Sequence, residues 1–171
     1  GEKILDEISM KYEGTHFNHN VESVRELMVL ENNGKGINAT IQVLDGILCH
    51  NGEFVQDTYT PIKKTKEEFL SEYESCYVDS NRIKKLRPMT LEGCVVRISD
   101  LIGYLGRDIE DAERLGVLKP KSVPKEIAEV LGSNNREIVN SIIVDIIANS
   151  QDKPYIKLSD KVFKAIVDLK N

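Results

Sequence analysis

The chain has 171 residues, of which 40% are hydrophobic and 30% charged, and this is enough for one globular domain with a sizeable core. Its formal net charge of −5 argues against a generic nucleic-acid binder, because phosphate contacts need clustered Lys and Arg. We also expect no membrane span and no signal peptide, and three widely spaced cysteines argue against a thiolate zinc site and for a reducing, cytoplasmic compartment.

Hydrophobic periodicity predicts an all-α fold. The predicted helices cover residues 2–12, 19–32, 37–50, 65–77, 90–114, 124–131, 134–149 and 158–169. Thr65, with Glu68 three residues later, has the pattern of a capping box. Residues 33–36 are expected to form a turn that ends the second helix, and residues 51–64 a loop or a short hairpin. Because the first helix begins at residue 2, we expect the chain to start inside a structured region, as a fragment does.

A helix-breaking segment at residues 119–124, with two prolines, predicts a boundary in the second half of the chain. We expect residues 1–115 to form the main helical body and residues 116–171 a small C-terminal helical segment. The isoleucine-rich residues 138–147 are expected to form a buried core helix, with a subunit interface as the alternative.

The helix predicted at residues 90–114 has two different faces at about 100° per residue. The apolar face consists of Val95, Ile98, Leu101, Ile102, Leu105 and Ile109. The opposite face consists of Asp100, Tyr104, Arg107, Asp108 and Asp111. Gly103 and Gly106 lie between them, a costly choice in mid-helix unless another group approaches closely. The polar face is either solvated or binds a cation and a ligand hydroxyl through its acids.

His19 stands at the start of a predicted helix, with an asparagine on each side. A carboxylate such as Glu2, bonded to one imidazole nitrogen, would fix the tautomer and make the pair a general acid or base. The alternative, which spacing alone favours, is that Glu2 is a solvated first-turn acid and His19 a helix cap. His16 is predicted to be a loop residue, and His50 a cation at a helix C-terminus. No i, i+4 spacing supports a metal site built from these three histidines.

Four motifs follow one another along residues 1–113 with a characteristic spacing. They are Gly1-Glu2, Phe17-x-His19-Asn20-x-Glu22-Ser23-x-Arg25, Leu44-Asp45-Gly46-Ile47-Leu48-x-His50 and Arg97-x-x-Asp100-x-x-x-Tyr104-x-x-x-Asp108-x-Glu110-Asp111-Ala112. Together they resemble the deoxyguanosinetriphosphate triphosphohydrolase-like family of the HD-domain superfamily. Residues 116–171 match that family only loosely. The resemblance implies an HD-domain helical fold that is incomplete at the N-terminus.

The resemblance also implies a reaction, the metal-dependent hydrolysis of a deoxynucleoside triphosphate to the deoxynucleoside and triphosphate. By resemblance, His19 and Glu2 are the catalytic pair. Asp100 matches one of the family's four ligands to a divalent metal ion such as Mg or Mn. The other three ligands would precede Gly1, so we expect this chain alone to be inactive.

By the same resemblance, Tyr104 packs on the nucleoside sugar and Asp108 bonds its 3′-hydroxyl. The base of the substrate is not indicated. Family members form homo-oligomers, so self-association is expected. Two alternatives stay open, an HD phosphohydrolase that acts on another phosphate ester and a helical binding or oligomerisation piece without catalysis.

Overall fold

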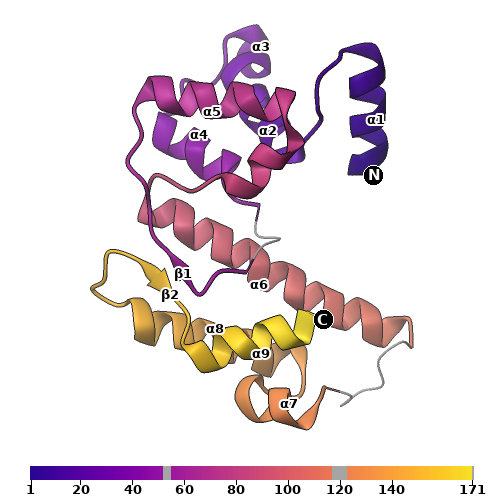
Figure 1. The fold of residues 1–171 in the computed structure, drawn as a ribbon, viewed down its shortest axis with the longest axis vertical. Helices are drawn as coiled ribbons and strands as arrows, with labels where there is room; N and C mark the ends of the chain where they lie inside the picture. Colours follow the sequence, from indigo (N-terminus) through magenta and orange to yellow (C-terminus); the bar gives the residue numbers. More distant parts are fainter. Residues whose placement is uncertain (52–54, 117–122, 171) are drawn as a thin grey trace. The chain divides into compact units, whose positions relative to one another are not determined.

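The computed structural model describes residues 1–51, 55–116 and 123–170. Helices dominate this part of the chain, and its strands form one two-stranded sheet (Figure 1). The predicted all-α fold class is therefore confirmed, while the HD-domain topology implied by the resemblance stays a prediction. No helix within the described ranges is long and apolar enough to cross a membrane.

The chain divides into two compact units. Unit 1 comprises Gly1–Asn51 and Pro61–Arg97, and unit 2 comprises Gly52–Thr60 and Ile98–Asn171. The long helix α6 (Leu91–Arg114) contributes residues to both. The predicted boundary between residues 115 and 116 separates a main helical body from a C-terminal segment, which is not the division into these two units. It stays a prediction.

Unit 1 is made of short helices whose ends are set by local chemistry. Before α6 these are α1 (Glu2–Tyr12), α2 (His19–Arg25), a π-helical turn (Glu26–Leu30), α3 (Glu31–Gly34), α4 (Ile41–Leu48), α5 (Lys66–Val78) and a 3₁₀ turn (Ser80–Lys85). The capping box that opens α5 is confirmed, because the Thr65 hydroxyl accepts from the Glu68 backbone N–H while the Glu68 carboxylate accepts from Thr65 N–H.

Two predicted helices differ from the observed ones. The helix predicted at residues 19–32 is divided by the π-helical turn, and its end is set by Asn32 and Asn33, whose φ angles of 55° and 57° are left-handed. The helix predicted at residues 37–50 begins four residues later, at Ile41, because Thr40 caps it by accepting from the backbone N–H of Val43.

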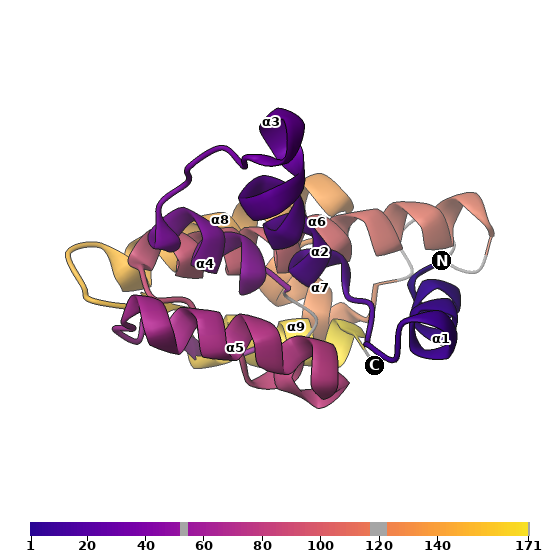
Figure 2. The ribbon, with the colours of Figure 1, turned by 90° about the horizontal axis from the view of Figure 1, so that it is seen from above.

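The core of unit 1 lies between α2, α4 and α5, which Figures 1 and 2 both show side by side. Its fully or almost fully buried side chains are Val21, Val24, Leu44, Leu48, Cys49, Phe69, Cys76 and Leu86. Within the helices the pairs Val21 and Val24, Leu44 and Leu48, and Phe69 and Cys76 lie three, four and seven residues apart, as on one face of a helix. The apolar face of α2 therefore anchors the helix that begins at His19.

A buried carboxylate, that of Asp45, connects segments around this core. The Asp45 side chain is 1% exposed and accepts hydrogen bonds from Lys64 Nζ at 2.7 Å and from the Met89 backbone N–H at 2.6 Å. Lys64 is itself 5% exposed and also donates to the Glu72 carboxylate. Burial by itself would lower the pKa of Lys64, but its neighbours, the Asp45 and Glu72 carboxylates among them, outweigh burial and raise that pKa. The lysine is thus held as a cation that joins α4 to α5.

Unit 2 contains the rest of α6, then α7 (Lys125–Leu131), α8 (Asn135–Ser150) and α9 (Asp160–Lys170). Strand β1 (Thr58–Tyr59) pairs antiparallel with β2 (Ile156–Lys157). A loop or a local hairpin was the prediction for residues 51–64. A strand, β1, does lie in this range. It is not part of a local hairpin, because it pairs with β2 near the C-terminus.

The amphipathic pattern predicted for α6 is confirmed for most of its apolar face. Ile98, Leu101, Ile102 and Leu105 are buried, whereas Val95 is 45% exposed and does not belong to the buried face. The side chain of Ile109 lies outside the described part of the structure. The helical pattern of α6 thus correctly predicts which of its described apolar side chains are buried in unit 2.

Gly106 is required by a close approach, as the sequence predicted. A Cβ atom at this position would lie 2.7 Å from Oδ1 of Asn135, the first residue of α8. At Gly103, by contrast, a Cβ atom would meet no other group within 4 Å. The mid-helix glycine at residue 106 therefore serves packing between α6 and α8, and the glycine at residue 103 leaves open space.

The isoleucine-rich helix α8 is buried along one face only. Ile138 and Ile142 are buried, but Ile143, Val144 and Ile147 are 43–58% exposed. The prediction of a fully buried helix is therefore wrong for the second face. Burial of one stripe is the pattern of an amphipathic helix that packs on one side only.

We predict that Asp45→Asn lowers the free energy of unfolding by about 3–5 kcal/mol, since it leaves the buried Lys64 ammonium without one of its carboxylates. Urea unfolding followed by circular dichroism measures the change. The double variant Asp45→Asn with Lys64→Met removes both charges and should lose less than the single variant. An equal or larger loss in the double variant would show that Asp45 acts by packing rather than by charge.

Candidate functional site

Helix α1 is attached to unit 1 through two carboxylates rather than through a core, because none of its residues is buried. Glu2 and Asp6 are one turn apart on the same face. Glu2 Oε1 accepts from the His19 backbone N–H at 2.8 Å and lies 3.0 Å from His19 Nδ1. Asp6 Oδ1 accepts from the Phe17 backbone N–H at 2.8 Å and lies 3.0 Å from His16 Nδ1. The structure thus brings together the predicted Glu2–His19 pair, and it adds a second pair that the sequence analysis missed.

The start of α2 fixes the position of His19. The next residue, Asn20, is fully buried, and its Nδ2 donates to the Leu48 carbonyl at 2.6 Å. Val21 and Val24 continue into the core. The His19 side chain is left 42% exposed. A helix anchored by one buried face therefore presents the imidazole at the surface of unit 1.

The contacts of the two carboxylates set their charge. Burial by itself would raise the pKa of Glu2, but the hydrogen bonds from the backbone and the ring of His19 outweigh burial and hold that pKa below its ordinary value. The hydrogen bond from the Phe17 backbone N–H is the main cause that lowers the pKa of Asp6. Both groups are therefore ionised near neutral pH and can only accept hydrogen bonds.

His50 joins the site from the end of α4. Its Nδ1 lies 2.6 Å from the carbonyl oxygen of Ile47, and its Nε2 lies 3.2 Å from Nε2 of His19. The predicted position of His50 at a helix C-terminus agrees with the first contact, whereas the second contact was not predicted. The bond from Asn20 to the Leu48 carbonyl brings the end of α4 to the start of α2, and nothing local in the sequence reports it.

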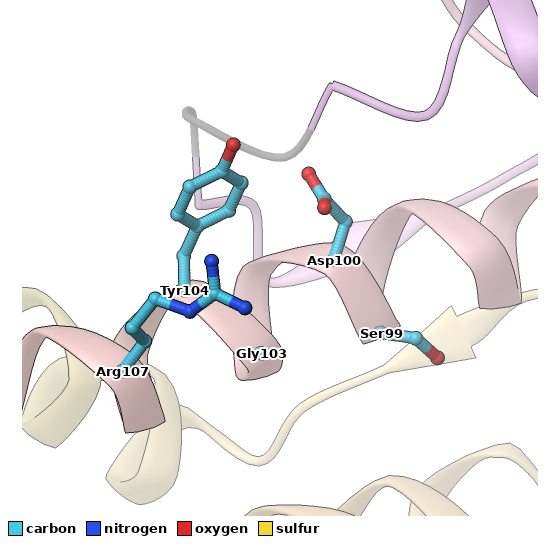
Figure 3. A pocket seen from close by; sticks show the side chains of 5 residues that line it. All are labelled: Ser99, Asp100, Gly103, Tyr104 and Arg107. Carbon is cyan, nitrogen blue, oxygen red and sulfur yellow. The ribbon is translucent and has the colours of Figure 1, made fainter. Parts of the chain in front are cut away.

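A pocket of about 290 Å³ lies along α6 in unit 2. It is lined by Ser99, Asp100, Gly103, Tyr104 and Arg107. Figure 3 shows the side chains of Asp100 and Tyr104 on the same side of the helix, one turn apart. Tyr104 is 52% exposed, and its ring can stack on a ligand. Asp108 belongs to α6, but its side chain lies outside the described part of the structure.

The described residues by themselves do not form a metal site. Within these ranges no three His, Cys, Asp or Glu side chains are grouped so that they could hold an ion. Asp100 is a single carboxylate in a pocket that also contains the Arg107 cation. Its predicted role as a metal ligand therefore stays a prediction and needs further ligands from elsewhere.

Comparison with known proteins identifies the family. No protein-family model and no solved structure matches the chain. It is 34% identical over 154 residues to the "Deoxyguanosinetriphosphate triphosphohydrolase-like protein" of Caldanaerobacter subterraneus subsp. tengcongensis, a match that covers 90% of this chain and 36% of the relative. A protein of the same name from Desulfatibacillum aliphaticivorans is 32% identical over 173 residues, which is 99% of this chain and 42% of the relative.

A third relative of that name, from Clostridium perfringens, is 34% identical and is matched over 90% of this chain. The class that these matches define is that of triphosphohydrolase-like proteins. The chain belongs to the deoxyguanosinetriphosphate triphosphohydrolase-like family, and it spans about two fifths of the length of the relatives that it matches.

We predict that α1 is released from unit 1 in acid. Because the pKa values of Glu2 and Asp6 are lowered by folding, their stabilising effect is complete above the ordinary values of 4.5 and 3.8 and is lost as the pH falls through the lowered values. Hydrogen exchange of the α1 amides should therefore be faster in Glu2→Gln/Asp6→Asn than in the unchanged chain near neutral pH.

As the pH falls through the lowered pKa values, this difference between the two proteins should shrink, since the carboxylates of the unchanged chain are then becoming protonated. Glu7→Gln, a change of an exposed acid on the same helix, is the control and should behave as the unchanged chain. If Glu7→Gln accelerates exchange as much as the double variant does, general charge on α1 holds it in place and the two carboxylate contacts do not.

Proposed function

We propose that this chain carries the proton donor and the sugar contacts of an enzyme that hydrolyses a deoxynucleoside triphosphate to the deoxynucleoside and triphosphate. The observation that carries the proposal is the hydrogen-bonded pair of Glu2 and His19 at the start of α2. The name shared by the relatives supports the class of reaction. The proposal extends that class to particular residues of this chain.

In the proposed reaction His19 is the general acid. Glu2 is ionised and accepts from the ring, so Nδ1 of His19 carries a hydrogen and Nε2 is the nitrogen that can exchange a proton with a substrate. Water or hydroxide attacks the α-phosphorus, and cleavage of the bond between that phosphorus and the 5′-oxygen leaves an alkoxide, which needs a proton. Protonated Nε2 of His19 supplies it, and Glu2 stabilises the charge of the imidazolium.

Residues of α6 provide the substrate contacts in this proposal. Tyr104 stacks on the deoxyribose, and Asp108 accepts from its 3′-hydroxyl. Asp100 gives one carboxylate to a divalent metal ion, whose other ligands come from outside the described residues. When bound, such an ion neutralises charge on the triphosphate. Self-association of the enzyme is part of the proposal.

We predict that His19→Ala lowers turnover by about 10²–10⁴-fold with little change in the Michaelis constant, because a general acid acts mainly in the transition state. The assay is release of triphosphate from each deoxynucleoside triphosphate, with divalent metal added, by the natural protein that carries this chain at its full natural length. Glu2→Gln should act in the same direction but less, since Glu2 only orients and polarises the ring.

His16→Ala is the matched control, because His16 has the same kind of carboxylate partner in the same unit. It should leave turnover near normal. An equal loss in the His16 and His19 variants would indicate that attachment of α1, rather than proton transfer, supports activity.

We predict that Asp100→Ala removes most of the bound divalent metal from the same full-length protein, because a methyl group cannot replace a carboxylate ligand. Elemental analysis after gel filtration measures the metal content. Glu92→Ala, a change of an exposed acid on the same helix, should leave it unchanged. Normal metal content in Asp100→Ala would remove Asp100 from the ligand set.

A further inference from the structure

The contact between His19 and His50 is not explained by the proposed function. Their rings meet edge to face, with centroids 5.1 Å apart and planes inclined by 74°. The two Nε2 atoms lie 3.2 Å apart. This is a hydrogen-bond distance, so one nitrogen must donate to the other.

The other two ring nitrogens are fixed by partners that can only accept. Nδ1 of His50 faces the carbonyl oxygen of Ile47 at 2.6 Å, and a carbonyl has no hydrogen to give. Nδ1 of His19 faces the ionised carboxylate of Glu2 at 3.0 Å. Both Nδ1 atoms therefore carry a hydrogen, and two neutral rings would point two lone pairs at each other. The contact is favourable only when one further proton lies between the two Nε2 atoms.

We propose that His19 and His50 share a single proton between their Nε2 atoms, which makes His50 a positioning residue for the general acid. Four ring nitrogens then hold three hydrogens. The ionised Glu2 lies on the far side of His19 and offsets the extra positive charge. The catalytic role of His50 rests on the proposed function. The shared proton itself does not, because it follows from contacts within this chain.

The shared proton gives His50 a definite role in the reaction. In the resting state Nε2 of His50 accepts a hydrogen bond from Nε2–H of His19 and so fixes the orientation of the His19 ring. When a leaving oxygen replaces His50 at that hydrogen, the proton moves from nitrogen to oxygen. The pair is left with its two Nδ1 hydrogens and no net charge, and a proton from water restores the third. Because Ile47 tethers His50, the acceptor returns to the same place after each cycle.

A metal ion is the competing occupant of the space between the two nitrogens. Histidines that bind a metal also donate Nδ1–H to a carboxylate or a carbonyl, as these two do. However, a bound ion needs more than two protein ligands to be held well, and no third His, Cys, Asp or Glu in the described ranges completes such a group. The proton is therefore the occupant that the contacts favour.

The chain is suited to a direct test, since it contains only three histidines. Labelling them with ¹⁵N gives six ring-nitrogen resonances, which His16→Asn, His19→Asn and His50→Asn assign one ring at a time. In chelator-treated buffer near neutral pH, we expect Nδ1 of both His19 and His50 to be protonated. We expect their two Nε2 resonances to have values between those of protonated and unprotonated nitrogen.

His50→Asn keeps a donor for the Ile47 carbonyl and removes the partner of His19, so it should shift the His19 Nε2 resonance. His50→Gln is the second variant, in case the first does not fold, and should shift it too. His16→Asn is the matched control and should leave it in place. Two fully protonated or two unprotonated Nε2 atoms would overturn the inference. So would stoichiometric Zn²⁺ binding that moves both Nε2 resonances and is lost in His50→Asn.

Turnover separates this inference from the proposed function. In the full-length protein, His50→Asn should lower turnover by about 10-fold, as loss of an orienting partner does, and less than His19→Ala. A shared proton seen by NMR in the unchanged chain would support the inference. If turnover were nevertheless normal in His19→Ala, the proposed function would be rejected. Strong loss in His19→Ala without a shared proton would keep the function and reject the inference.

Discussion

The buried carboxylate of Asp45 is the constraint on which the rest of unit 1 depends. It is bonded to Lys64, which precedes α5, and to the backbone of Met89, which precedes α6, so one side chain fixes α4 against both segments. The end of α4 then receives Asn20 through the Leu48 carbonyl. A buried carboxylate without these partners would be strongly unfavourable. The site inherits its geometry from this network, because His50 reaches His19 only while α4 stays in place.

Helix α1 is held by the opposite kind of interaction. It buries no residue and depends on two half-exposed carboxylates, each of which accepts from one backbone N–H and one imidazole. Segments with few buried apolar contacts open at low free energy. The orientation of the proposed acid therefore relies on a helix that buries no apolar side chain. Glu2 and His19 link that helix to the start of α2.

Local patterns predicted the local features of the structure. The capping box at Thr65 and the buried stripe of α6 depend on spacings of three and four residues, which a sequence displays directly. The contacts that define the site join residues far apart in the chain, as between His19 and His50. Such contacts follow from how helices pack, so the helix-end position of His50 could be predicted from local pattern but its partner could not. The partner of β1 was missed for the same reason, since β2 lies near the other end of the chain.

The two histidines bonded to α1 show what distinguishes a candidate acid from a structural contact. His16 and His19 have the same first partner, a lowered-pKa carboxylate at 3.0 Å from Nδ1. A carboxylate–imidazole pair is therefore not, by itself, a sign of catalysis in this chain, because one such pair is enough to hold a helix. The difference lies at the other nitrogen, where His19 alone meets a second imidazole that can hold or release a proton. The chemistry of unit 1 is thus set by where α4 ends.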